Sequence, residues 1–194
     1  MSHDDNLVLG IDVGSSEVKV VVCTIGDKGD ICICGKGASV VAGLSRGEII
    51  DVDQLMVSID RAVKRAAVNH DVDMCKVVVN IPLFDVKFVH NMGFLLSQNE
   101  NGQISEKDRL ECIRRSKNLV NKAGYYSLHV IPLVYKVDDV IVKNPVGVFG
   151  QKLEVQTQVV LAPYSTVNQI VDVLKRLNFK VCVIFQQEKD KKLI

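Results

Sequence analysis

The segment Asp-Val-Gly-Ser-Ser-Glu-Val-Lys, which begins at Asp12, holds residue types that suit the binding of a polyanion. Asp12 follows an apolar run, where a carboxylate can hold a hydrated Mg²⁺ beside phosphates. Gly14 lets a ligand approach the backbone closely. Ser15 and Ser16 offer backbone N–H groups and hydroxyls in a tight turn that can cradle an anion. Lys19 follows on the next strand and adds a positive charge, so the pattern predicts a phosphate site on a β-hairpin.

The same segment has a plainer interpretation, and the local pattern leaves both open. Asp-x-Gly-Ser is also a common hairpin turn, and a lysine on a strand is often only solvated. Two better-known phosphate motifs, Gly-x-x-x-x-Gly-Lys-Ser/Thr and Gly-x-Gly-x-x-Gly, do not occur in the sequence.

The elements that must position this turn come from the first part of the chain. Apolar runs at Leu7 to Val13, Glu17 to Thr24 and Ile31 to Val41 are separated by short turns rich in Gly, Ser and Asp, which favours an antiparallel meander. Asp51 to His70 has apolar residues at helical spacing, with Asp51 or Asp53 placed to cap its start. Cys75 to Ile81 is predicted to be a buried strand.

The middle of the chain is less continuously apolar, and the closing part returns to the style of the first. Ser105 to Asp108 resembles a capping box and predicts a helix to about Ala123, ended by Gly124. The further elements expected are strands at Tyr126 to Ile131, Tyr135 to Val142 and Leu153 to Leu161, a helix at Thr166 to Leu177, and a strand at Lys180 to Phe185.

The composition is that of a soluble globular protein of one large domain or two small ones. The 194 residues carry 24 Lys and Arg against 23 Asp and Glu, which argues against a nucleic-acid partner. No apolar run reaches 18 residues, so no transmembrane segment is expected, and the polar start does not resemble a signal peptide. The six cysteines are interpreted as reduced and buried in a cytoplasmic protein. The spacing of Cys32 and Cys34 does not suit zinc.

The predicted hairpin followed by β-α-β resembles the first half of the actin and heat-shock chaperone ATPase fold, whose first phosphate loop has the pattern Asp-x-Gly-Ser/Thr. Three later segments resemble the FtsA family of bacterial cell-division actins: Ser45 to Asp51, His129 to Tyr135, and Lys143 to Val148. The similarity runs from about Leu7 to Phe185, and Asn-Pro-x-Gly together with the preceding His-x-Ile-Pro-x-x-Tyr is its most specific part.

This resemblance implies an α/β fold of the actin-like, ribonuclease H-like type with an α+β insertion. Residues 1–82 would be the first part of subdomain IA, 83–161 the inserted FtsA-type subdomain 1C, and 162–194 the return to IA. It further implies ATP and Mg²⁺ as ligands. The phosphates would contact Gly14, Ser15, Ser16 and Lys19, and Asp12 would bind Mg²⁺ through water.

The resemblance also implies a role in cell division without catalysis by this chain alone. Such a protein would assist assembly and membrane anchoring of the FtsZ ring at the septum, on the cytoplasmic face of the inner membrane, and would recruit later division proteins. FtsZ, other division proteins and a second copy of the chain are the partners expected. Arg109, Arg114 and Arg115 are candidates for a partner surface, although a solvated helix face is the more usual explanation of such residues.

The sequence also departs from the family pattern. A second phosphate loop, Asp-x-Gly-Gly-Gly, is not found, and Gln187 to Ile194 has no apolar face that would lie on a membrane. Weak or absent ATP binding, and impaired FtsZ binding and membrane tethering, are therefore expected. Two alternatives stay open. One is an ATP-dependent phosphotransferase of the sugar-kinase branch, for which Asp71 and Asp73 are carboxylates by type only. The other is a remnant of a split gene without function.

Overall fold

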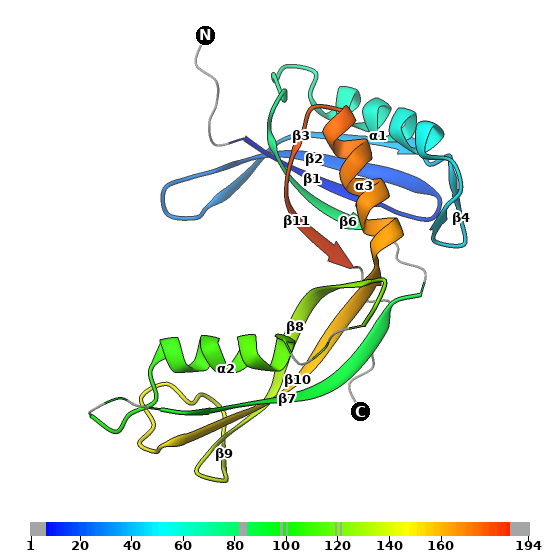
Figure 1. Cartoon of the computed structure of the whole chain (residues 1–194). Helices are drawn as coiled ribbons and strands as arrows, with labels where there is room; N and C mark the ends of the chain where they lie inside the picture. Colours follow the sequence, from blue (N-terminus) through cyan, green and yellow to red (C-terminus); the bar gives the residue numbers. More distant parts are fainter. Residues whose placement is uncertain are drawn as a thin grey trace. The chain divides into compact units, whose positions relative to one another are not determined.

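The computed structural model describes residues 7–81, 85–97, 99, 101–118, 120 and 122–186. These residues form eleven strands and three helices. They divide into two compact units, one within residues 1–84 and 165–194 and the other within 85–164 (Figure 1). None of the helices in the described ranges is long and apolar enough to cross a membrane.

The first unit is built on a five-stranded sheet with the order β11-β6-β1-β2-β3. The strands β1 (Leu7–Val13), β2 (Glu17–Ile25) and β3 (Ile31–Val40) pair antiparallel in succession, so the predicted meander is confirmed. The strands β6 (Lys76–Ile81) and β11 (Lys180–Gln186) extend the sheet in parallel with β1. Two short strands, β4 (Leu44–Ser45) and β5 (Glu48–Ile49), form a separate ribbon.

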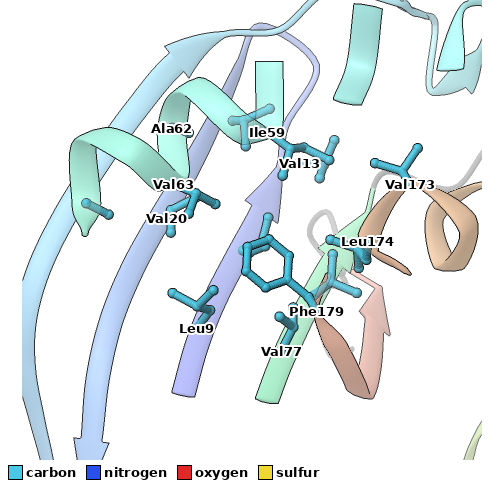
Figure 2. Close-up of a cluster of buried hydrophobic side chains, with 14 of the residues drawn as sticks. Leu9, Val13, Val20, Ile59, Ala62, Val63, Val77, Val173, Leu174 and Phe179 are labelled. Atoms are coloured by element: carbon cyan, nitrogen blue, oxygen red, sulfur yellow. The ribbon is translucent and has the colours of Figure 1, made fainter. Parts of the chain in front are cut away.

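One face of this sheet is buried beneath two helices, α1 (Val52–Ala66) and α3 (Tyr164–Arg176). Asp51 caps α1 as predicted, because its side chain accepts a hydrogen bond of 3.0 Å from the Gln54 N–H. Alternate residues of β1, β2 and β6 point into the core, as a period of two requires. Figure 2 shows Leu9, Val13, Val20 and Val77 from the sheet, Ile59, Ala62 and Val63 from α1, Val173 and Leu174 from α3, and Phe179 gathered in this core.

The helix α1 lies unusually close to β3 because Gly37 has no side chain. A Cβ atom at position 37 would stand 2.2 Å from the carbonyl oxygen of Ala62 and 2.5 Å from the amide nitrogen of Ala66. Ser39 and Ser58 add a buried polar contact at the same interface, in which the Ser39 hydroxyl donates to the Ser58 carbonyl at 2.5 Å. The close approach fixes α1 against one end of the meander.

The second unit is a four-stranded antiparallel sheet with α2 (Glu106–Asn118) packed on one face. Its strand order is β7 (Lys87–Leu96), β10 (Lys152–Pro163), β8 (Tyr125–Val137) and β9 (Val140–Val142). It has a hydrophobic core of its own, formed by Leu95, Ile104, Cys112, Val137, Leu153 and Val155.

The capping box at the start of α2 is confirmed. The Ser105 hydroxyl accepts from the Asp108 N–H at 3.2 Å, and the Asp108 carboxylate accepts from the Ser105 N–H at 2.9 Å. The helix ends at Asn118 rather than near Ala123. Beyond it the Val120 N–H donates to the carbonyl three residues back, which is a turn bond and not a helical one.

Two further expectations for strands and thiols were wrong. The predicted break between the strands near Pro132 does not occur, because β8 runs through Pro132. The pairing of β8 with β10 shifts register at the partner residue, Thr157, where a missing N–H is tolerated.

The expectation that all six thiols are buried was also wrong. Cys32, Cys34 and Cys182 are exposed. Cys32 and Cys34 lie at the start of the edge strand β3, where all four residues from Ile31 to Cys34 are exposed, and Cys182 lies on β11, the strand at the other edge.

Candidate phosphate site

Asp12 lies at the centre of a row of polar residues that crosses three strands of the first unit. It is the partner of Lys19 across the β1–β2 pairing and of Asn80 across the β1–β6 pairing. Paired residues of neighbouring strands point to the same face. Because Ile11 and Val13 point into the helix-covered core, this row lies on the opposite face of the sheet.

The Asp12 carboxylate is held by a side chain that the sequence analysis did not single out. The Asn80 amide nitrogen donates to Asp12 Oδ1 at 2.8 Å. The carbonyl oxygen of the same amide is buried and has no hydrogen-bond partner among the described residues. Asn80 is the one polar residue near the end of the apolar run Val77 to Ile81, and the parallel register of β6 with β1 is the signal that brings it to Asp12.

Gly14 is required by the hairpin itself. Its N–H donates to the Glu17 carbonyl at 3.0 Å and closes the turn, so this amide is already engaged. A Cβ atom at position 14 would lie 2.9 Å from the same carbonyl oxygen, closer than real Cβ contacts allow. Ser15 and Ser16 form the exposed tip of the turn. The Ser16 carbonyl accepts from the Val41 N–H at 3.1 Å, which ties the tip to the end of β3.

Lys19 lies beside the turn with its ammonium group in solvent. Its side chain is 60% exposed and forms an ion pair of 3.0 Å with Glu17, whose side chain is 45% exposed. The hydrogen bond and the negative charge of Glu17 raise the pKa of Lys19, and the negative charge of Asp12 adds to the effect. The cation that the sequence predicts is therefore present, but an incoming anion has to compete with Glu17 for it.

The arrangement combines one carboxylate, one ammonium group and the hydroxyls and amides of a tight turn at the carboxyl ends of two parallel strands. Ligands of open α/β sheets bind at such an edge. No cluster of three or more His, Cys, Asp or Glu side chains that could hold a metal ion occurs within the described ranges. A single carboxylate such as that of Asp12 suits a cation that keeps most of its own water, as Mg²⁺ does beside phosphates.

The other sequence candidates have partners of their own. Arg109 pairs with Glu106, and Arg114 and Arg115 share Glu111, so all three arginines form ion pairs within α2 and the shared pair leaves one net positive charge. The Asp71 carboxylate accepts from the Asp73 N–H at 3.1 Å, and the Asp73 carboxylate accepts from the Asn178 side chain at 2.5 Å. These two aspartates stabilise turns, as their positions after α1 suggest.

Comparison with known proteins gives the second unit a family. Residues 85–161 match the SHS2 domain inserted in FtsA. The chain is 27% identical over 177 residues to cell division protein FtsA of Borreliella burgdorferi, covering 91% of this chain and 43% of that protein. It is 23% identical over 179 residues to FtsA of Escherichia coli strain K12, covering 92% of this chain and 42% of that protein. Residues 85–161 thus carry the SHS2 domain that is inserted in FtsA, and most of the chain is similar in sequence to FtsA proteins.

The similarity to FtsA covers only part of the length of the FtsA proteins. The chain spans less than half of the FtsA proteins to which it is similar. Among solved structures it resembles the PilM–PilN type IV pilus biogenesis complex with a TM-score of 0.60 and 16% identity, over 92% of this chain and 47% of that one. At that identity the likeness concerns the fold alone. The predicted class, an actin-like α/β fold with an FtsA-type insertion, is confirmed.

Proposed function

We propose that this chain is a cell-division protein whose first unit binds the phosphates of a nucleotide. The observation that carries the proposal is the row of Asp12 and Lys19 on one sheet face, next to the Ser15–Ser16 turn and at the carboxyl ends of β1 and β6. In this assignment residues 1–82 and 162–194 form subdomain IA, and 83–161 form subdomain 1C. The FtsA relatives supply the biological context.

The residues present fit Mg-ATP as the ligand. Asp12 has a fixed carboxylate with hard oxygen donors, which suit the water shell of Mg²⁺. Lys19 and the amides and hydroxyls of Ser15 and Ser16 suit phosphate oxygens. When bound, Mg²⁺ would neutralise phosphate charge. The chain's own groups bind and orient, and no residue of the row is placed as a base for an attacking water, so we propose binding without catalysis.

Binding by the chain alone should be weak. Strong ligand sites bury most of the ligand surface and converge several polar groups on it. Lys19, Ser15 and Ser16 are exposed, and Lys19 has to exchange its Glu17 partner for the phosphates. One exposed sheet face and one turn provide a single wall of such a site.

Titration of the chain with Mg-ATP, followed by NMR or calorimetry, tests the binding proposal. Weak saturable binding is expected for the natural sequence. Lys19→Ala and Asp12→Asn should each reduce it, whereas Lys28→Ala, which removes an exposed lysine from the next turn, should not. Equal affinities for all four proteins would contradict the assignment of the row.

The division role has its own test in cells. We propose FtsZ, later division proteins and a second copy of the chain as partners, at the cytoplasmic face of the inner membrane at the division site. A fluorescent fusion should concentrate at mid-cell in dividing bacteria that carry labelled FtsZ. Uniform fluorescence throughout the cell, with the fusion intact by immunoblot, would contradict this role.

A further inference from the structure

Asn80 has a geometry that packing alone does not explain. It stands near the end of β6, a strand rich in valine, with its amide nitrogen 2.8 Å from Asp12 Oδ1. Its amide oxygen is buried without a partner among the described residues. A buried acceptor left without a hydrogen bond costs about 1–3 kcal/mol, and an apolar residue at this position would avoid that cost.

The orientation of the amide is dictated by Asp12. An ionised carboxylate only accepts hydrogen bonds, so the side chain must turn its NH₂ group toward it and its oxygen away. The oxygen then lies where no described donor reaches it. The Asn80 side chain thus donates a hydrogen bond to Asp12 while its own amide oxygen stays without a donor. A residue that only filled the core would not carry such an unsatisfied oxygen.

We propose that Asn80 is a positioning residue of the nucleotide site, which fixes the Asp12 carboxylate so that its second oxygen is presented to a hydrated divalent cation. The inference rests on the proposed function, because it assigns the role of Asn80 within the same site. Residues that hydrogen-bond a metal-binding carboxylate restrict its rotamer, and their loss typically lowers metal affinity by 10- to 100-fold. The register Asp12–Asn80 places this restraint directly beside the turn.

The first test is Asn80→Ala, read in two ways. Affinity for ATP is measured with Mg²⁺ and again with EDTA, and thermal stability is measured without ligand. We expect affinity for Mg-ATP to fall roughly tenfold, affinity for metal-free ATP to stay unchanged, and the melting temperature to change little, because removal of an unsatisfied acceptor offsets the lost hydrogen bond to Asp12. A lower melting temperature with unchanged Mg²⁺ dependence would show a purely structural residue and would overturn the proposal.

Gln54→Ala is the matched control. Gln54 makes an equivalent amide-to-carboxylate bond of 3.0 Å to Asp51 at the start of α1, and the backbone N–H of residue 54 keeps the helix cap after the side chain is lost. This variant should leave both ATP affinities at the level of the natural sequence. A Mg²⁺-specific loss as large as that of Asn80→Ala would count against the assignment.

A second variant tests the inference even if the natural chain binds no nucleotide. Asn80→Asp would set a second carboxylate against Asp12, and the two like charges repel each other. We expect this variant alone to gain thermal stability on addition of MgCl₂ without ATP, over a KCl control of equal ionic strength. Failure of Mg-ATP to bind the natural chain, with this Mg²⁺ effect intact, would remove the nucleotide proposal and keep the role of position 80. No Mg²⁺ effect in Asn80→Asp would overturn the role.

Discussion

At the scale of single residues, the candidate phosphate site contains a group that attracts an anion, Lys19, and a group that already pairs with it, Glu17. The types at Asp12, Ser15, Ser16 and Lys19 were readable from the sequence, and their assignment to a ligand stays a prediction. Two neighbours were not readable. Asn80 is brought to Asp12 by a parallel register between residues 68 positions apart. Glu17 lies only two residues before Lys19. The sequence does not show that the two side chains form an ion pair, because that depends on side-chain geometry.

Glu17→Gln should strengthen anion binding. The substitution removes the carboxylate that holds Lys19 and lowers the raised pKa of that ammonium toward its ordinary value. Stability should hardly change, because exposed ion pairs contribute little. Titration with inorganic triphosphate at low salt should show an affinity several-fold above that of the natural chain. The control is Asp60→Asn, which breaks the exposed pair with Lys64; an equal gain there would mean that net charge alone is responsible.

Asp108 should make the second unit sensitive to acid. Burial by itself would raise the pKa of this carboxyl, but hydrogen bonds from Ser105, Asn99 and Ser97 outweigh it and hold the pKa below its ordinary value of 3.8. A depressed carboxyl pKa adds stability that is complete above 3.8 and is lost as the pH falls through the folded value. Melting temperature followed by circular dichroism should therefore decline below about pH 4.

The matched variant for this prediction is Asp108→Asn. It should lower stability at pH 7 by about 1 kcal/mol, because the amide lacks the negative charge that strengthens the hydrogen bonds from Ser105, Asn99 and Ser97, and should flatten the acid decline. Asp27→Asn, in an exposed turn, should reproduce the profile of the natural chain. An unchanged acid slope in Asp108→Asn would assign the sensitivity to other carboxyl groups.

At the scale of elements, local pattern was reliable wherever one physical rule decided the outcome. The meander, the cap at Asp51 and the capping box at Ser105 follow from turn and cap chemistry, and the structure confirms them. Pro132 misled because its missing N–H breaks a strand only when the ladder needs that bond. Here the register shift at Thr157 removes the need. This register shift lies on another strand, β10, so the sequence around Pro132 does not predict it.

The uneven burial of the six cysteines leads to a chemical prediction about their thiols. Cys32, Cys34 and Cys182 are exposed, whereas Cys75 and Cys112 are buried, and burial raises the pKa of Cys112 to about 11. In the native chain an aromatic disulfide reagent at pH 8 should therefore react quickly with three thiols, and with the buried pair only after unfolding. Cys23, half-buried with its pKa raised mainly by burial, should react at an intermediate rate. Uniformly slow reaction of all six would contradict the described burial.

At the scale of the whole molecule, fold class and family were foreseeable because many weak signals agreed. The hairpin and the β-α-β order indicated the actin-like fold, and the Asn-Pro-x-Gly segment indicated a resemblance to FtsA; the comparisons bear out both. The ligand could not be settled in the same way. A nucleotide site needs converging side chains around most of the ligand, and the described residues provide one row and one turn.

The second unit should fold without the first. Its sheet and α2 enclose a core that includes Leu95, Ile104 and Leu153, and among the described residues this cluster is separate from that of the first unit. Residues 85–164 expressed alone should therefore unfold cooperatively, with a melting temperature close to one transition of the intact chain.

Gly93→Val gives the matched variant, because a Cβ atom there would lie 2.3 Å from the Cys112 carbonyl oxygen and force α2 away from β7. Overpacking of this kind costs about 1–3 kcal/mol. In the intact chain this variant should lower one calorimetric transition and leave the other in place; a single transition that shifts as a whole would mean that the two units unfold together.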